Sequence, residues 1–594
     1  MTSLTSDVSA RPGVMTPAGI DRAAALTRRR VIVAALILVS YAVIGVGMWK
    51  ICAAGGWTIV DALMMLCYIV AAPWSVLGFW NAAIGLWLLH VKPNGARDVA
   101  GFAEAAVGHA PAQRTAILMT IRNEDPARAL TRFAAVKRSV DATGAGAAFD
   151  YYVLSDTTDA AVGAAEEAAF ARWQAQEANS PSTLVYRRRE ANEGFKAGNV
   201  RDFCRRWGHH YEFMLPLDAD SLMTGESIVR IARIGEAWPR LGILQTLVVG
   251  MPSRSAFARI FQFGMRHGMR PYTMGSAWWA GDCGPFWGHN ALVRVKPFLE
   301  HGQLPVLPGG PPLGGPIMSH DQVEATFMRR AGFEVRVLPI EGGSYEENPP
   351  TLLEFTRRDL RWCQGNMQYW RLLGTPGLRP MSRFQLIWAI MMFVGIPAWT
   401  RMILLAALKP FDGEKLAEFP TGLAKLLYLA FLLMYLAPKL AGFLDIALTR
   451  GKIAEYGGAL RFATGCLTEL GFSFLLGAAT TLRTSIFMIN LLFGRSVIWN
   501  GQARDAHALS FATAAQGLWP QTLFGVVVIA LMAFGAPAMI PWALPLVAGY
   551  VLAIPFAMAT ASPALGEVLA RWRLCAIPEE FDTPVEIATV QSKS

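Results

Sequence analysis

The distribution of apolar residues is the feature that most limits what this chain can fold into. Hydrophobic residues make up 53% of its 594 residues and charged residues only 16%, a balance outside the range of soluble proteins. The long apolar runs lie towards the two ends, whereas most charged residues fall between Val91 and Arg383. The pattern therefore predicts a soluble domain inserted between membrane-spanning segments.

The apolar runs also predict the order of the segments. Two runs precede the soluble domain, at Val31–Trp49 and Ile59–Leu89, and each is long enough to cross a bilayer. Others follow it, at 384–408, 423–448, 467–492, 523–534 and 539–560. The expected organisation is a disordered tail over 1–30, transmembrane helices over 31–90, the soluble domain over 91–383, transmembrane and interfacial helices over 384–562, and a polar tail over 563–594.

The run 467–492 differs from a simple span because polar residues interrupt it. An arginine near the bilayer centre, as at Arg483, costs about 2.5 kcal/mol or more. Glu469 adds a second charge. We therefore expect an interfacial or re-entrant helix pair here, after which the polar segment Trp499–Asp505 would fold back toward the active site.

Arginines at the outer ends of the apolar runs predict the orientation of the chain. Arg28–Arg30 precede the first run, and Arg571 and Arg573 follow the last. Under the positive-inside rule both termini and the soluble domain face the cytoplasm, which requires an even number of spans. We expect six to eight.

Charge and cysteine content exclude several other classes of protein. The net charge is +10, but the arginines cluster at the edges of apolar runs and no recognition motif accompanies them, so nucleic-acid binding is not expected. The seven cysteines are widely spaced and form no CxxC pair. This spacing argues against a disulfide framework, a zinc site or a redox motif.

Strand and helix patterns alternate in the soluble domain. This alternation predicts an α/β domain with a mostly parallel sheet and helices on both faces. In such sheets the ligand lies beyond the carboxyl ends of the strands. The candidate strands are Thr115–Thr120, Phe149–Ser155, Thr183–Arg187, Phe213–Leu217 and Ile243–Val248.

Two carboxylates at the end of one candidate strand give the strongest chemical signal. Asp218 and Asp220 follow the apolar residues Leu215–Leu217 and are separated by one residue. In an extended chain such residues share a face, so both can bind one hard cation such as Mg²⁺ or Mn²⁺. The cation would neutralise a diphosphate leaving group. A solvated turn is the plainer alternative.

Two further polar residues follow strands or turns in the same region. Asp156 ends a second candidate strand and is suited to accept from a nucleobase or ribose, although an Asx-turn or helix cap explains it nearly as well. Lys196 begins the segment Lys-Ala-Gly-Asn. Its cation is suited to a phosphate, and a charged surface turn is an equal alternative.

Asp321 and the segment around Arg361 complete the candidate site. Asp321 stands before an expected helix, either as a cap or as a base that accepts the proton of an attacking sugar hydroxyl. Arg358, Arg361 and Trp362 lie on nearly one helical face. Guanidinium groups bind diphosphate and an indole stacks on a sugar ring, while a basic helix at the membrane interface is the alternative.

The order of these motifs resembles the D, DxD, D, QxxRW signature of processive family 2 glycosyltransferases, which include cellulose and hyaluronan synthases. Finer detail is similar to the glucans biosynthesis glucosyltransferase H family, over about Val31 to Pro584. Arg358 stands where the wider signature has glutamine, and Arg122 where relatives commonly carry tyrosine. The stretches that carry the finer likeness are Leu217–Ser221, Gly288–Ala291, Ser319–Asp321, Gly343–Glu346 and Arg361–Asn366.

The resemblance implies a fold, a reaction and a set of partners. It implies a GT-A (nucleotide-diphospho-sugar transferase) domain that transfers glucose from UDP-glucose, with inversion, onto the glucan backbone of osmoregulated periplasmic glucans. It further implies Mg²⁺ or Mn²⁺, a bacterial inner membrane, a glucan acceptor, and a periplasmic glucan-processing protein and acyl carrier protein as partners. The implied roles are Asp156 and Lys196 for the nucleotide sugar, Asp218 and Asp220 for nucleotide and metal, Asp321 as base, Arg358 and Arg361 for diphosphate, and Trp362 for the acceptor.

Two rival functions remain open at this point. Another polysaccharide synthase, such as a cellulose synthase, would differ in sugar and acceptor geometry, and product analysis separates the two. A membrane transporter is the non-enzyme alternative, but it would have no need of aspartates at strand ends. Release of UDP by the purified protein distinguishes enzyme from transporter.

Overall fold

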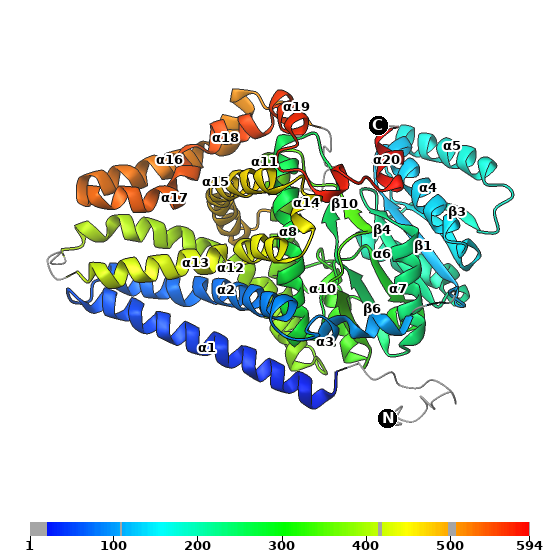
Figure 1. The fold of residues 1–594 in the computed structure, drawn as a ribbon, viewed down its shortest axis with the longest axis horizontal. Helices are drawn as coiled ribbons and strands as arrows, with labels where there is room; N and C mark the ends of the chain where they lie inside the picture. Colours follow the sequence, from blue (N-terminus) through cyan, green and yellow to red (C-terminus); the bar gives the residue numbers. More distant parts are fainter. Residues whose placement is uncertain (1–20, 107, 109, 414–418, 497–505, 593–594) are drawn as a thin grey trace.

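The large sheet of the central domain is mixed, and it stands beside a bundle of long helices (Figure 1). The computed structural model describes residues 21–106, 108, 110–413, 419–496 and 506–592. Seven strands are ordered β3-β2-β1-β4-β8-β6-β9, and a small sheet is ordered β5-β10-β7. The strands are β1 Thr115–Ile121, β2 Phe149–Ser155, β3 Leu184–Arg188, β4 Phe213–Asp218, β5 Leu222–Met223, β6 Leu241–Thr246, β7 Val249–Gly250, β8 Ala291–Arg294, β9 Glu334–Leu338 and β10 Ser344–Glu346.

Helices cover both faces of the large sheet, as the alternating pattern predicted. Period-2 alternation along β1 sends Ile117 and Met119 to one apolar core and Ala116 and Leu118 to the other. The strand β8 runs antiparallel to β4 and β6, whereas the other pairs of the large sheet are parallel. The principal helices of the domain are α4 Pro126–Ala142, α5 Ala160–Gln176, α6 Phe195–Trp207, α7 Gly225–Ala237, α8 Ala256–Ala280, α9 Val295–His301, α10 Asp321–Arg330 and α11 Leu352–Met367.

Six helices of the described chain are long and apolar enough to cross a membrane. A further pair, Pro537–Val551 and Ala553–Thr560, meets the same criteria jointly but is bent by 61°. These numbers agree with the six to eight spans expected from the sequence. The six helices are α1 Ala23–Ala53, α2 Ile59–His90, α12 Pro380–Leu408 with its extension to Phe411, α13 Thr421–Leu448, α15 Ala459–Leu492 and α16 Phe511–Gly535.

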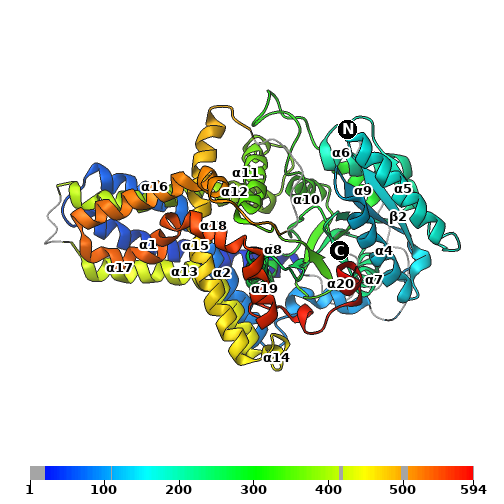
Figure 2. The same cartoon turned by 90° about the horizontal axis from the view of Figure 1, so that it is seen from above.

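Helix α15 is one continuous helix, so the expected helix pair at 467–492 is wrong. Figures 1 and 2 show that it runs across the direction of α1, α2, α12, α13 and α16, which extend side by side away from the sheet. The bent pair returns beside α16 (Figure 1). Arg483 on α15 donates to the backbone oxygen of Gly517 at 2.8 Å. A transverse helix removes the need to place this charge at a bilayer centre. The segment Trp499–Asp505 lies outside the described residues.

The described parts of the two expected tails, 21–30 and 563–592, are folded against the central domain, whereas residues 1–20 lie outside the described residues. Helix α1 begins at Ala23, and Arg30 binds Asp282 of the domain at 2.7 Å. At the other end, α19 Pro563–Trp572 and α20 Val585–Gln591 follow the last apolar helix. Helix α20 packs against α4 (Figure 2), and its Ile587 and Val590 are buried in the core of the central domain. The start of α1 and helix α20 therefore both lie against the domain that contains the sheet.

Candidate active site

The strand register brings the predicted aspartates to one edge of the sheet. Thr120 of β1 pairs with Asp218 of β4, and Ile121 pairs with Ser155 of β2. Asp156 follows directly and donates its backbone N–H to the Ile121 oxygen at 2.9 Å. Both aspartates thus stand where the parallel strands end, which is where such sheets bind ligands.

Asp156 is buried and paired rather than capping a helix. Arg189 donates to its two carboxylate oxygens, from Nε to Oδ1 at 2.7 Å and from Nη2 to Oδ2 at 2.6 Å. The cap of α5 is instead Asp159, whose side chain accepts from the backbone N–H of Ala161 and Val162. The alternative of a helix cap at Asp156 is therefore wrong.

Lys196 points into the site from the first turn of α6. Its ammonium group forms an ion pair with Asp218. The helix begins after Gly194, whose φ of 69° lies in the left-handed region. A Cβ on Gly198 would lie 1.8 Å from the carbonyl oxygen of Glu193, so glycine is required there. Asn199 fixes the helix to β2 by donating to Leu154 at 3.0 Å.

Two residues that the sequence did not single out as site residues join the aspartates. Nε2 of His289 lies 3.6 Å from Oε2 of Glu346. Burial raises the pKa of Glu346, and the charges of Asp220 and Asp218 raise it further. Arg358 opposes that rise, as does His289. These five side chains therefore share one electrostatic site.

The charge balance around Asp218 keeps it ionised. Burial by itself would raise the pKa of its carboxyl, but Lys196 and His289 hold that pKa below its usual value. The nearby Asp220 acts in the opposite direction. The carboxylate at the end of β4 is thus available as an anionic ligand.

Asp321 is the first residue of α10, not a residue ahead of the helix. The N-cap is His320, and no side-chain cap hydrogen bond is formed there. His320 does not bind Asp321: its Nδ1 lies 2.8 Å from Oε2 of the buried Glu324. Although burial lowers the pKa of His320, Glu324 and Asp321 raise it above its usual value overall. The two carboxylates thus favour the protonated form of His320.

The loop before Asp321 is fixed by the segment that carries Arg361 and Trp362. Tyr369 donates to the backbone oxygen of Ser319 at 2.8 Å, and Gln368 accepts from the backbone N–H of Met318 at 2.9 Å. A Cβ on Gly365 would lie 2.3 Å from Oγ of Ser319. The α11 segment thus sets the position of Asp321 as well as supplying side chains of its own.

The Gly/Pro-rich loop Leu307–Pro316 is held by the same segment. Gln364 donates to the oxygen of Pro312 at 3.2 Å, and Gln368 donates to that of Pro316 at 3.1 Å. Leu307 and Gly315 also form an antiparallel bridge. The loop is therefore a fixed border of the site.

Arg358 and Trp362 stack on one face of α11. The guanidinium carbon of Arg358 lies 4.9 Å from the centre of the Trp362 ring. Trp362 itself is 49% exposed to solvent. Arg361 lies one residue before it on the same helix, half-buried. An exposed indole face of this kind can stack on a sugar ring, and the role of Trp362 at the acceptor stays a prediction.

The comparisons with known proteins agree with this geometry. A model of the glycosyl transferase family group 2 matches residues 213–441. The chain is 36% identical over 591 residues to a glucans biosynthesis glucosyltransferase H of Caulobacter vibrioides strain NA1000, covering 95% of this chain and 88% of that protein. Proteins of the same name match from Xanthomonas campestris strain B100 (35%, covering 89% and 84%) and Bradyrhizobium diazoefficiens (34%, covering 92% and 76%).

One solved structure shows a weak likeness. It is a mannosyltransferase from Pyrobaculum calidifontis in complex with GDP-Man and Mn²⁺, with a TM-score of 0.40 and 15% identity, covering 65% of this chain and 98% of the other. That score lies below the level at which a shared fold follows. The identity and coverage of the named relatives are decisive instead: this chain is a family 2 glycosyltransferase and belongs to the glucans biosynthesis glucosyltransferase H family.

Proposed function

We propose that this membrane glycosyltransferase transfers glucose from UDP-glucose, with inversion, onto a growing β-glucan and passes the polymer across the bacterial inner membrane. The names of its relatives support glucan synthesis. The single observation that carries the chemistry is the ion pair of Lys196 with Asp218 at the end of β4. The charge of Lys196 also acts on Glu324, which lies about one turn after Asp321 on α10.

The residues present fit a divalent cation. Asp218 and Asp220 offer hard oxygen ligands, and the buried Glu346 adds a negative charge nearby. Among the described residues, no group of three acidic, histidine or cysteine side chains gathers closely enough to hold a metal unaided. Magnesium sites of this kind use one or two carboxylates together with substrate phosphates. A bound Mg²⁺ or Mn²⁺ would supply neutralising charge to the leaving diphosphate.

The chain's own side chains supply the rest of the reaction. Asp321 accepts the proton of the acceptor hydroxyl as that oxygen attacks the anomeric carbon. Arg358 and Arg361 bind diphosphate oxygens, and Trp362 holds the acceptor sugar against its exposed face. Asp156, oriented by Arg189, accepts from the uridine. The acceptor oxygen attacks the anomeric carbon from the side opposite to the departing UDP. This single displacement inverts the configuration of that carbon.

Incubation of the purified full-length protein with UDP-glucose and Mg²⁺ tests the proposal. We expect UDP release together with a polymer whose linkage analysis shows a β-glucan. Release of UDP without polymer would indicate hydrolysis or a missing acceptor, and addition of short glucan acceptors separates these two cases. Polymer formation from a different nucleotide sugar only would overturn the choice of donor.

Gly365→Ala is expected to lower the turnover number by about 10²-fold, because a displacement of roughly 1 Å at a reacting group has effects of this size. The new methyl group would lie 2.7 Å from the backbone nitrogen of Ser319, so the loop before Asp321 must move. Initial rates and UDP affinity are measured together. Gly374→Ala is the matched control, since nothing lies within 4 Å of its Cβ. Equal rates in both variants would contradict the positioning role.

The orientation in the membrane is tested by cysteine labelling. In a background lacking the seven native cysteines, single cysteines are placed at Phe411, which is 52% exposed beyond α12, and at Ser592 after α20. An impermeant thiol reagent added outside spheroplasts is expected to label position 411 and to leave 592 unlabelled, as the positive-inside rule requires. Labelling of 592 alone would place the catalytic domain outside and overturn the topology.

A further inference from the structure

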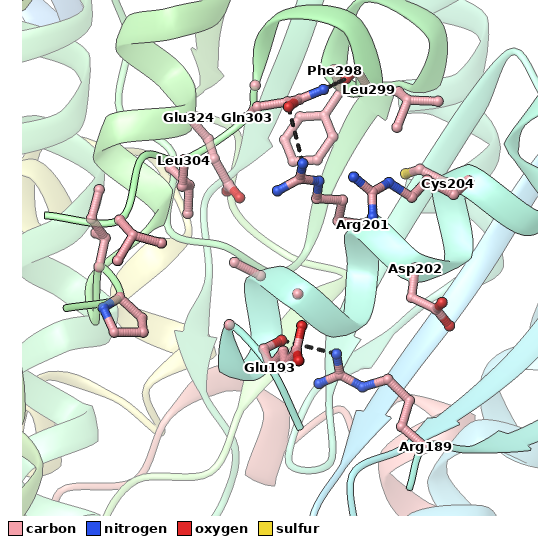
Figure 3. Close-up of a pocket in the computed structure, with 18 of the residues that line it drawn as sticks. Arg189, Glu193, Arg201, Asp202, Cys204, Phe298, Leu299, Gln303, Leu304 and Glu324 are labelled. Carbon is pink, nitrogen blue, oxygen red and sulfur yellow. Dashed lines mark hydrogen bonds between the residues drawn. The ribbon is translucent and has the colours of Figure 1, made fainter. Parts of the chain in front are cut away.

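A cavity that the proposed catalytic aspartates do not line lies beside α6. It has a volume of about 990 Å³ and is bordered by α6, the end of α9, and the residues that follow α9 (Figure 3). Its size falls within the usual range of small-molecule sites. Arg189, the partner of Asp156, is one of its lining residues. None of the proposed catalytic, metal or nucleotide residues lines it. Those residues are Asp156, Lys196, Asp218, Asp220, Asp321, Arg358 and Arg361.

The arginines of this cavity are unevenly paired. Arg201 and Arg205 lie about one helical turn apart on α6, and neither forms an ion pair within the part of the chain that the structure describes. Nη2 of Arg201 donates to Oε1 of Gln303 at 3.0 Å, as Figure 3 shows, while its buried Nε has no hydrogen-bond partner. The other lining arginines are paired: Arg188 with Glu167, Arg189 with Asp156, and Arg206 with Asp202.

Neither guanidinium group of this pair is bound by one of the carboxylates that also line the cavity, and the exposed Arg205 and half-buried Arg201 are accessible to an anion from solvent. Burial lowers the pKa of Arg201, and the positive charge of Arg205 lowers it further. Guanidinium groups match phosphate oxygens in paired geometry, with charge-assisted hydrogen bonds. A phosphate between the two side chains would supply the missing acceptors.

The facing wall has a different chemistry. It is formed by the apolar side chains of Phe298, Leu304 and Val306, and Val306 is 75% exposed. Such a surface suits the ring or carbon skeleton of a ligand rather than a bare ion. We propose that this cavity is a second binding site, for a small metabolite that carries a phosphate group on a carbon skeleton.

One residue connects the cavity to the proposed base, Asp321. Glu324 lines it, and Figure 3 shows this side chain directed toward the space between α6 and Leu304. The same carboxylate holds His320, the neighbour of Asp321. A ligand at Arg201 therefore changes the field at Glu324 and the rate of transfer. This second part rests on the proposed role of Asp321 as base.

Calorimetric titration of the full-length protein in nanodiscs tests the site without requiring turnover. The probe is glucose 6-phosphate, added with UDP and Mg²⁺ at saturation so that the donor site is filled. We expect the double variant R201Q/R205Q to bind at least about tenfold more weakly, since it removes the charge-assisted hydrogen bonds to the phosphate. Arg206→Gln, a change of the same kind on the same helix, is expected to bind as the wild type does.

The binding site would be overturned if the wild type did not bind the probe at about 10 mM, a concentration above the range of typical KM values. Equal binding by R201Q/R205Q would overturn it too, as would complete displacement of the probe by UDP. Inorganic phosphate forms a second arm. Binding as tight as that of the sugar phosphate would refute the part assigned to the apolar wall. Free glucose is expected not to bind, and its binding would refute the part assigned to the arginines.

The coupling is tested by initial rates of glucan formation. The probe is expected to change the rate of the wild type and of Arg206→Gln, but not that of R201Q/R205Q, whose basal rate stays within about twofold because neither arginine touches the catalytic crevice. Binding without any change in rate would reject the route through Glu324. The titration measures binding without turnover, so it can still be interpreted if the protein does not synthesise glucan. The binding-site proposal and the proposed function can therefore be refuted independently.

Discussion

Replacing Asp321 by asparagine is expected to lower sugar transfer by about 10²- to 10⁴-fold, the usual contribution of a general base. The substitution preserves the size and shape of the side chain at the first position of α10 but removes its capacity to accept a proton. Initial rates of UDP release measure the loss. Affinities for UDP and for the metal are expected to stay near those of the wild type, because the nucleotide is bound by other residues.

The matched control is Asp125→Asn. Asp125 caps α4 by accepting from the backbone N–H of Arg128, and asparagine caps helices equally well. The control therefore makes the same chemical change at the start of another helix in the same domain. Turnover of Asp321→Asn within about tenfold of the control would refute the assignment of the base.

Replacing Asp220 by alanine is expected to lower activity by roughly 10²-fold or more, because charge neutralisation by a metal contributes several kcal/mol to phosphoryl chemistry. UDP affinity is also expected to become nearly independent of Mg²⁺ or Mn²⁺. Titrations with and without EDTA measure that dependence directly, without turnover. An unchanged dependence on metal would place the cation elsewhere.

The two variants control one another. Asp321→Asn is expected to retain the metal dependence of UDP binding, and Asp220→Ala to lose it, although both lose transfer. A loss of metal dependence in both would indicate that Asp321 is itself near the cation rather than a base alone. This contrast distinguishes the roles of the two carboxylates better than activity does.

The parallel strands were predictable because their sequences carry the signal locally. The apolar run Phe149–Ser155 is β2 to the residue, and β1 extends only one residue beyond its prediction. By contrast, β9 (Glu334–Leu338) was missed because it buries two charges. Arg336 and Glu334 bind each other at 2.7 Å, so tertiary pairing permits what the sequence pattern does not suggest.

The site was predictable to the same extent. The aspartates at strand ends are local signals, but Glu346 lies on the short strand β10, which no run of apolar residues marks. It reaches the site only because the small sheet β5-β10-β7 forms. The direction of α15 was only partly signalled: Arg483 and Glu469 argued against a simple span, although the length and hydropathy of the helix meet the criteria for one.

The burial of helix α20 in the central domain affects when that domain becomes fully stable during synthesis. Ile587 and Val590 are buried in the core of the central domain, and Glu586 bonds to Ser139, so these last residues complete a domain whose sheet begins at Thr115. Burying two such side chains contributes about 1.5–3 kcal/mol each. Chains leave the ribosome N-terminus first. The domain therefore reaches its full stability only after the membrane helices that precede α20 have been made, and a chain whose insertion stalls is left with an incomplete core that quality-control proteases can recognise.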